Sequence, residues 1–298
     1  VRASPTSVSS VKVMLSDETM QRWLSNESSA GEEGGLRPPI EEFGNETPTV
    51  HGRALTEANI RGGMKWHIIR LFSTNDYLGL SAHTDVLQAV AQTVLSQGMG
   101  PRASALVAGY THLHRELETA LAQLKETEEC LLFPTGFSAN TAVIATLCGS
   151  SGTEKVAIFS DALNHASIVD GARLSKSSGA ELHIFRHNDL EHLEQLLESS
   201  SAERKLVVTD SIFSMDGDVA PLSGLARLKR KHKFLLVVDE AHATLVCGHN
   251  GGGAVQQAGV THDVDIHIGT LSKAFGSMGG FAACSREFKQ VLLTKGRA

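Results

Sequence analysis

The chain has 298 residues, of which 20% are charged and 41% hydrophobic, an ordinary composition for a globular protein of one or two domains. Its formal net charge of -6 argues against a nucleic-acid partner, and its apolar runs are too short to span a membrane. The four cysteines, at 130, 148, 247 and 284, are widely spaced and form no C-x-x-C pair, so we expect no metal site and a reducing compartment.

The first 70 residues differ in composition from the rest of the chain. Ser, Glu, Gly and Pro dominate stretches such as 25–39, and this composition buries too little apolar surface to offset the entropy of ordering. We expect residues 1–70 to form a partly disordered N-terminal arm, in which a short amphipathic piece around Trp23 can dock on the body. The chain starts at Val1 rather than Met and stops at Ala298 directly after a helix-like stretch, so we interpret it as a fragment.

Helical patterns begin after residue 71. The first predicted helix has apolar residues on one side, starts at a cap formed by Thr84 or Asp85, and ends at Gly98. A second helix is indicated by leucines at helical spacing over 113–124, and a third covers 137–147 after Gly136. Two later helices are expected at 190–197 and 222–231.

Five short apolar runs alternate with these helices. They cover residues 156–159, 182–185, 206–209, 234–238 and 266–268. Runs of this length, bounded by polar residues, are typical of buried parallel strands, so the pattern predicts an α/β fold with a mostly parallel sheet. In such a sheet ligands bind beyond the carboxyl ends of the strands, and the residues that follow each strand are therefore the candidates for a site.

Asp239 directly follows the apolar run 234–238. A buried carboxylate is costly unless it has a cationic partner, and a protonated pyridine nitrogen would be such a partner. His242 lies three residues later and could donate to a phenolic oxygen on the same ring. The ordinary explanation is that Asp239 caps a helix and His242 is unrelated to it. A helicase box reading of Asp239–His242 is excluded, because the chain has no phosphate-binding G-x-x-x-x-G-K-[ST] loop upstream.

Lys273 follows the run 266–268 in a Thr-x-x-Lys segment with glycines after it. Burial makes a lysine nucleophilic by lowering its pKa, so Lys273 is a candidate for an imine to an aldehyde cofactor, with Thr270 bonding the cofactor phosphate. The ordinary explanation is an exposed lysine in a flexible glycine loop.

Three further positions have both a ligand-binding and an ordinary explanation. Gly136 and Phe137 start a helix whose amides can bind phosphate, or they are simply the first residues of that helix. His165 stacks on a pyridine ring or caps the next helix. Ser214 bonds a phenolic oxygen or is a turn-forming hydroxyl.

Seven motifs in order together resemble one family, the α-oxoamine synthases, which are fold-type-I PLP-dependent transferases. They are Asn75–Leu80, Gly98–Glu118, Pro134–Phe137, Asn164–Ser167, Phe213–Asp218, Asp239–His242 and Gly269–Lys273. The resemblance covers about residues 70–298. It implies a mostly parallel sheet with helices on both faces, and pyridoxal 5'-phosphate (PLP) as the cofactor.

The resemblance also implies a role for each candidate residue. Lys273 is the Schiff-base lysine and, once displaced by the substrate, moves protons at its α-carbon. Asp239 pairs with the pyridine nitrogen and His165 stacks on the ring as a further catalytic residue. His242 and Ser214 contact the phenolic oxygen, and Gly136, Phe137 and Thr270 serve the phosphate.

Within the family the segment Met99–Leu106 and the acidic arm resemble the plant form of the branch that condenses L-alanine with pimeloyl-CoA in biotin synthesis. A homodimer is implied, in the cytosol or, for a plant protein, the peroxisome. Three alternatives stay open. The first is another α-oxoamine synthase of the serine palmitoyltransferase, glycine C-acetyltransferase or 5-aminolevulinate synthase type. The second is an inactive fragment or a noncatalytic partner subunit, and the third is an aminotransferase on the same fold.

The family pattern continues beyond residue 298 with a smaller carboxy-terminal domain that supplies an arginine for the substrate carboxylate. We therefore expect residues 71–298 to be a PLP-binding large domain that is incomplete at its C-terminus, and the small domain to be missing.

Overall fold

The computed structural model describes residues 57–62, 65–70, 74–149 and 154–296. The chain divides into two compact units. Within the stretch predicted as an arm, β1 (Glu57–Gly62) and β2 (Lys65–Arg70) pair as a two-stranded sheet. The amphipathic piece around Trp23 lies outside the described residues.

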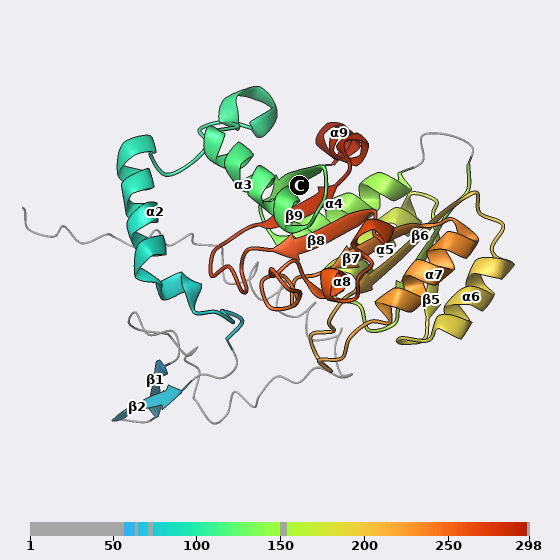
Figure 1. Cartoon of the computed structure of the whole chain (residues 1–298), viewed down its shortest axis with the longest axis horizontal. Coiled ribbons are helices and arrows are strands. Elements are labelled where there is room, and N and C mark those ends of the chain that lie inside the picture. The colour runs from blue at the N-terminus through green and yellow to red at the C-terminus, as the bar shows by residue number, and fades with distance from the viewer. Residues whose placement is uncertain (1–56, 63–64, 71–73, 150–153, 297–298) are drawn as a thin grey trace, which may run out of the picture. The chain divides into compact units, whose positions relative to one another are not determined.

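A seven-stranded sheet forms the centre of the second unit (Figure 1). Its strands are β3 (Glu129–Phe133), β4 (Val156–Asp161), β5 (Glu181–Phe185), β6 (Arg204–Asp210), β7 (Leu235–Asp239), β8 (Ile266–Thr270) and β9 (Gly280–Cys284). The order is β3-β9-β8-β7-β6-β4-β5, and β9 runs antiparallel to both of its neighbours. The pairs β4–β5, β4–β6, β6–β7 and β7–β8 are parallel, which confirms the mostly parallel sheet.

Helices connect the strands. They are α2 (Thr84–Gln97), α3 (His112–Leu124), α4 (Gly136–Cys148), α5 (Ala166–Ser177), α6 (Leu190–Ser199), α7 (Leu222–His232), α8 (Ala254–Gln257) and α9 (Arg286–Lys295), with short helical turns at Leu80–Ala82, Ala105–Gly109 and Thr261–Asp263. None of the described helices is long and apolar enough to cross a membrane.

Helices cover both faces of the sheet. Successive side chains of each strand point to opposite faces, so each central strand contributes to two apolar clusters, one on each face. Ile158 of β4 and Val208 of β6 belong to the cluster built with α4 and α5. Their neighbours Phe159 and Val207 belong to the opposite cluster, built with α6 and α7. Burial of each such side chain stabilises the fold by about 1.5–3 kcal/mol. The expected α/β arrangement with helices on both faces is confirmed.

Two local expectations were wrong. The first predicted helix begins at Thr84 with His83 in the N-cap position and no side-chain cap, so neither Thr84 nor Asp85 caps it. The run 182–185 is a strand but not a buried one, since β5 is the edge strand and Ile184 is 60% exposed. An edge strand has a neighbour on one side only and packs less completely.

Candidate active site

The carboxyl ends of three parallel strands meet at one pocket. Asp210 ends β6, Asp239 ends β7 and Thr270 ends β8, and all three line a cavity of about 240 Å³. Seven of the eight predicted site residues line it: Gly136, Phe137, His165, Asp239, His242, Thr270 and Lys273. The pocket therefore brings together residues from five separate segments of the sequence.

Asp239 is held by hydrogen bonds to both of its carboxylate oxygens. Its side chain is buried, Oδ1 accepts from the backbone N–H of Ala241 at 2.8 Å, and Oδ2 accepts from Nδ2 of Asn140 at 2.5 Å. A run of turns follows Asp239 rather than a helix, so the alternative reading as a helix cap is wrong. The carboxylate is thus fixed in orientation at the wall of the pocket.

Lys273 and His242 contact each other within the pocket. Nζ of Lys273 lies 2.7 Å from Nε2 of His242, and the other ring nitrogen of His242, Nδ1, lies 2.6 Å from the hydroxyl of Tyr77. Burial lowers the pKa of Lys273 against the opposing attraction of Asp239 and Asp210. Burial, with Lys273 and His165 nearby, lowers the pKa of His242 to about 4, so its ring is neutral at neutral pH.

Asp210 is a second carboxyl group beside Asp239. The two residues are partners in the β6–β7 register, and both are buried. Burial first, and then the charge of Asp239, raise the pKa of Asp210 to about 8. Two neighbouring buried carboxylates repel each other, and this repulsion adds to burial in favouring the protonated form of Asp210.

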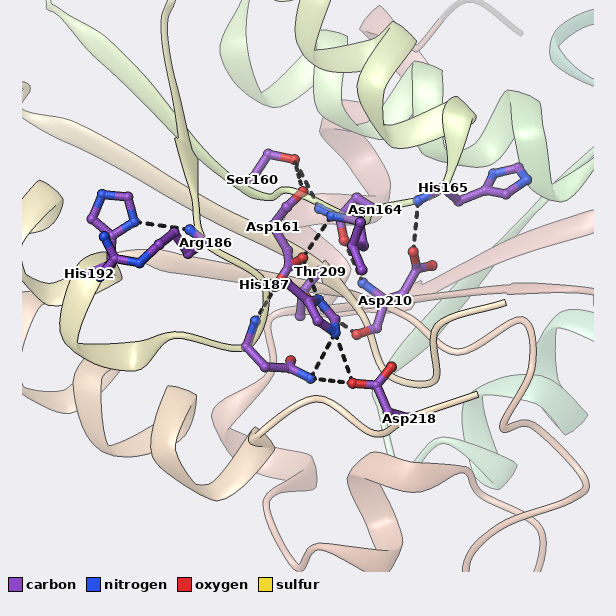
Figure 2. A network of polar contacts seen from close by, with 12 residues as sticks. Ser160, Asp161, Asn164, His165, Arg186, His187, His192, Thr209, Asp210 and Asp218 are labelled. Atoms are coloured by element: carbon purple, nitrogen blue, oxygen red, sulfur yellow. Dashed lines mark hydrogen bonds and ion pairs between the residues drawn. The ribbon is translucent and has the colours of Figure 1, made fainter. Parts of the chain in front are cut away.

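His165 is fixed by its backbone as well as by its ring. Its N–H donates to Oδ2 of Asp210 at 2.8 Å, and its ring, which Figure 2 shows pointing away from the rest of the network, meets Phe137 edge-on at 6.4 Å between centroids. The side chain of Asn164 donates to Ser160 and to the carbonyl of Val208. These bonds tie the turn that carries His165 to the end of the sheet.

The start of α4 leaves backbone donors free at the pocket. Thr135 caps the helix by accepting from the N–H of Ser138 at 3.0 Å, while Gly136 and Phe137 sit in the first turn, whose N–H groups have no partner within the helix. A Cβ added to Gly136 would lie 2.9 Å from Cβ of Thr270. Only glycine therefore lets the first turn of α4 approach the end of β8 this closely.

Ser214 does not join the other predicted residues. It lies in an exposed turn and does not line the pocket. Conversely, sequence reasoning assigned no role to four residues of the site: Tyr77, Asn140, Ser167 and Asp210. The Asn75–Leu80 motif and the position of Asp210 directly after the apolar run 206–209 were signals that pointed to two of them.

Comparison with known proteins gives concordant results. Residues 68–295 match the aminotransferase class I and II family. The chain is 49% identical over 300 residues to 8-amino-7-oxononanoate synthase of Arabidopsis thaliana, covering 97% of this chain and 59% of that protein. It is 48% identical to the enzyme of the same name from Trichlorobacter lovleyi, covering 76% of this chain and 57% of that protein. The chain thus spans less than two thirds of the length of these relatives.

Solved structures of two kinds share the fold. Sphingomonas wittichii serine palmitoyltransferase matches with a TM-score of 0.76 at 33% identity, covering 94% of this chain and 65% of that one. The 8-amino-7-oxononanoate synthase of Francisella tularensis matches with a TM-score of 0.62 at 29% identity, covering 75% of this chain and 60% of that one. A structure of SPT with a PLP internal aldimine matches with a TM-score of 0.77 at 31% identity, covering 94% of this chain and 66% of that one.

These relatives confirm the resemblance drawn from the motifs, and the family match extends over most of the sequence, from the segment before Tyr77 to the last helix. The chain belongs to the aminotransferase class I and II family.

Proposed function

We propose that this protein is a PLP-dependent enzyme that condenses L-alanine with pimeloyl-CoA, releasing CO2 and CoA and forming 8-amino-7-oxononanoate. The observation that carries the proposal is that a fixed buried carboxylate, Asp239, and an amine of lowered pKa, Lys273, line one pocket. The relatives named for this reaction supply the substrate class.

The residues present fit the cofactor. PLP offers an aldehyde, a phenolic oxygen, a ring nitrogen and a phosphate. The pocket offers an amine on Lys273, an imidazole on His242, a carboxylate on Asp239 and the first turn of α4. The close approach of Gly136 to Thr270 leaves a cradle with no side chain between the α4 amides and the strand end, where a phosphate would bind.

We assign the following roles to the residues of this chain. Lys273 would hold the cofactor covalently and, once released by the substrate amine, would move the proton at the substrate α-carbon. Asp239 would keep the ring nitrogen protonated, and His165 would cover the ring. His242 and Ser214 would contact the phenolic oxygen, which for Ser214 requires its exposed turn to move toward the pocket. PLP, when bound, supplies an electron sink that stabilises negative charge at that α-carbon.

Residues 71–298 would form the cofactor-binding domain, and a homodimer would complete the enzyme. The exposed apolar side chains of α2 support a partner surface, since Val90 and Leu95 are 55% and 88% exposed and no residue of α2 is buried. We propose a cytosolic location, with the peroxisome as the alternative for a plant protein.

The cofactor test is spectroscopic. Protein loaded with PLP should show the visible absorbance of a lysine-bound cofactor, and borohydride should fix the adduct at Lys273, as located by mass spectrometry of its peptides. Lys273→Ala should lose both signals, while Lys231→Ala, at an exposed site, should keep both. Wild-type protein without either signal would rule the proposal out.

The substrate test compares acyl donors. Activity should be highest with L-alanine and pimeloyl-CoA among acetyl-, succinyl-, pimeloyl- and palmitoyl-CoA, each paired with alanine, glycine and serine. The second candidate, a serine palmitoyltransferase, would be indicated by preference for serine with palmitoyl-CoA. Release of pyruvate from alanine without condensation would indicate an aminotransferase, and a cofactor-loaded protein inactive with every pair would indicate a noncatalytic subunit.

A further inference from the structure

A chain of buried polar side chains runs behind the pocket and connects Asp239 to His165. Asn140, on α4, is 1% exposed and donates from Nδ2 to Oδ2 of Asp239 at 2.5 Å and to Oγ of Ser167 at 2.9 Å. Ser167, in the first turn of α5, is fully buried, and its Oγ lies 2.7 Å from Nδ1 of His165. These hydrogen bonds thus lead from the end of β7 through α4 and α5 to His165 in the pocket.

The positions of the hydrogens in this series of hydrogen-bonded side chains can be assigned by counting donors. A carboxylate only accepts, so Asn140 must present its amide nitrogen to Asp239, and its second amide hydrogen goes to Ser167. The hydroxyl of Ser167 then has its own hydrogen left for Nδ1 of His165. The backbone N–H of Ser167 also donates to the same nitrogen at 3.2 Å. Two donors facing Nδ1 place the ring hydrogen of His165 on Nε2.

We propose that Asn140 is a positioning residue which, through Ser167, fixes the tautomer and the orientation of the His165 ring and couples both to Asp239. The backbone of His165 is held separately by Asp210, so the Asn140–Ser167 bridge determines the ring rather than the turn. The significance for catalysis rests on the proposed function, in which His165 covers the cofactor ring and Asp239 faces its nitrogen.

A merely structural role would predict a different outcome. If Asn140 only satisfied buried polar atoms, its replacement would lower stability without changing which nitrogen of His165 carries the hydrogen. If Asn140 positions His165, its loss frees the hydroxyl of Ser167 to accept a hydrogen from Nδ1. The backbone N–H of Ser167 is then the one remaining donor that favours hydrogen on Nε2, and part of the population shifts to the Nδ1 tautomer.

The decisive readout is the tautomer of His165 in cofactor-free protein labelled with 15N-histidine. Long-range 1H–15N spectra report which ring nitrogen carries the hydrogen, and the His165 signals are identified by their loss in His165→Gln. Wild-type protein should show hydrogen on Nε2, and both Asn140→Leu and Ser167→Ala should shift part of the population to Nδ1. Thr141→Val is the matched control, because Thr141 is the next residue of α4 and bonds only to carbonyls of its own helix.

A second readout concerns the loaded enzyme. Asn140→Leu and Ser167→Ala should each weaken PLP binding by about tenfold, and the double variant should lose less than the product of the two, because both changes break one chain. A folded Asn140→Leu protein with an unchanged His165 tautomer would overturn the inference. Should that variant not fold, Ser167→Ala decides in the same way. Failure of wild-type protein to bind PLP would instead count against the proposed function and leaves the tautomer measurement valid.

Discussion

Burial is the leading cause of every shifted pKa at the pocket, and it acts in opposite directions on acids and bases. It raises the pKa of Asp210 to about 8, lowers that of His242 to about 4, and lowers that of Lys273. Each shift favours the uncharged form. The pocket therefore leaves the amine of Lys273 closer to its nucleophilic state than the amine of an exposed lysine.

The pKa of His242 leads to a prediction about acid stability. An unfolded His242 takes up a proton near its ordinary value of 6.5, whereas the folded one does so only near 4. The free energy of unfolding should therefore fall as the pH drops through this range, because protons bind preferentially to the unfolded chain. His242→Asn should remove part of this slope in urea titrations of cofactor-free protein. His249→Asn, at an exposed histidine, should leave the slope as in wild type; equal slopes for wild type and His242→Asn would contradict the argument.

A second prediction at the residue scale concerns Gly136. The methyl group of Gly136→Ala would meet Cβ of Thr270 at 2.9 Å, so either α4 or the end of β8 must shift. We expect the affinity for PLP to fall by about tenfold or more, since the phosphate-binding amides move with α4. Gly100→Ala is the control, because its added Cβ meets no atom within 4 Å. The measurement is a titration of each variant with PLP, and equal affinities for Gly136→Ala and Gly100→Ala would refute the prediction.

At the scale of elements, His187 links three parts of the chain (Figure 2). It lies after β5 and contacts the end of β4 and the loop after β6. Its Nδ1 contacts Asp161 at the end of β4 at 2.9 Å, and its Nε2 contacts Asp218 in the loop after β6 at 2.8 Å. The adjacent Asn188 donates to the same two carboxylates. Burial opposes the charge on His187, but its bonds to Asp161 and Asp218 outweigh burial and raise the pKa of His187.

This arrangement predicts a pH dependence opposite to that of His242. A histidine whose pKa is raised by folding stabilises the fold fully below about pH 6.5, and the stabilisation is lost as the pH rises through the folded value. His187→Gln should therefore cost about 1 kcal/mol near pH 6 and less near pH 9, as measured by urea unfolding at both values. A cost that is the same at both values would show that His187 acts without its charge.

Element prediction from sequence worked where hydrophobic pattern decides the structure. All five predicted strands exist, because runs such as 206–209 are apolar on both sides and fill both cores. The elements that were not predicted include β3, β9 and α5. The strand β9 reads Gly-Phe-Ala-Ala-Cys, β3 reads Glu-Cys-Leu-Leu-Phe, and α5 carries Ser, Arg, Lys and Gly among few apolar residues. The secondary structure of these segments is determined by strand pairing and tertiary packing, which the hydrophobic pattern of a short segment does not reveal.

Seven of the eight predicted site residues line one pocket, and the roles assigned to them stay predictions. Residues at the carboxyl ends of strands, such as Asp239 and Thr270, were found because strand ends converge on one edge of the sheet. Asn140 and Tyr77 were assigned no role, since Asn140 lies within α4 and Tyr77 contacts His242 across 165 positions of the sequence. Ser214 was also predicted in the site, but it lies in an exposed turn and does not line the pocket.

At the scale of the whole molecule, a buried ion pair joins the end of α3 to the segment that follows Asp239 and carries His242. Nζ of Lys125 donates to Glu240, to Thr244 and to the carbonyl of Gly252, each at 2.8 Å, and neither Lys125 nor Glu240 is exposed. Burial opposes ionisation of Glu240, but Lys125 and His267 outweigh it and lower the pKa of Glu240 to about 2. The turn beside the pocket is thus anchored to a helix 115 positions away in sequence.

Removing one member of this pair should be far more costly than removing both. Lys125→Met leaves the carboxylate of Glu240 buried without its ammonium partner, and we expect a loss of about 3–5 kcal/mol in the free energy of unfolding. Lys125→Met combined with Glu240→Gln should recover part of that loss, because no buried charge remains. The exposed pair of Lys231 and Glu194, with a similar separation of 2.7 Å, is the control, and Lys231→Met should cost less than about 1 kcal/mol. Equal losses for Lys125→Met and Lys231→Met in urea unfolding would mean that water reaches Lys125 and that the turn is not anchored by charge.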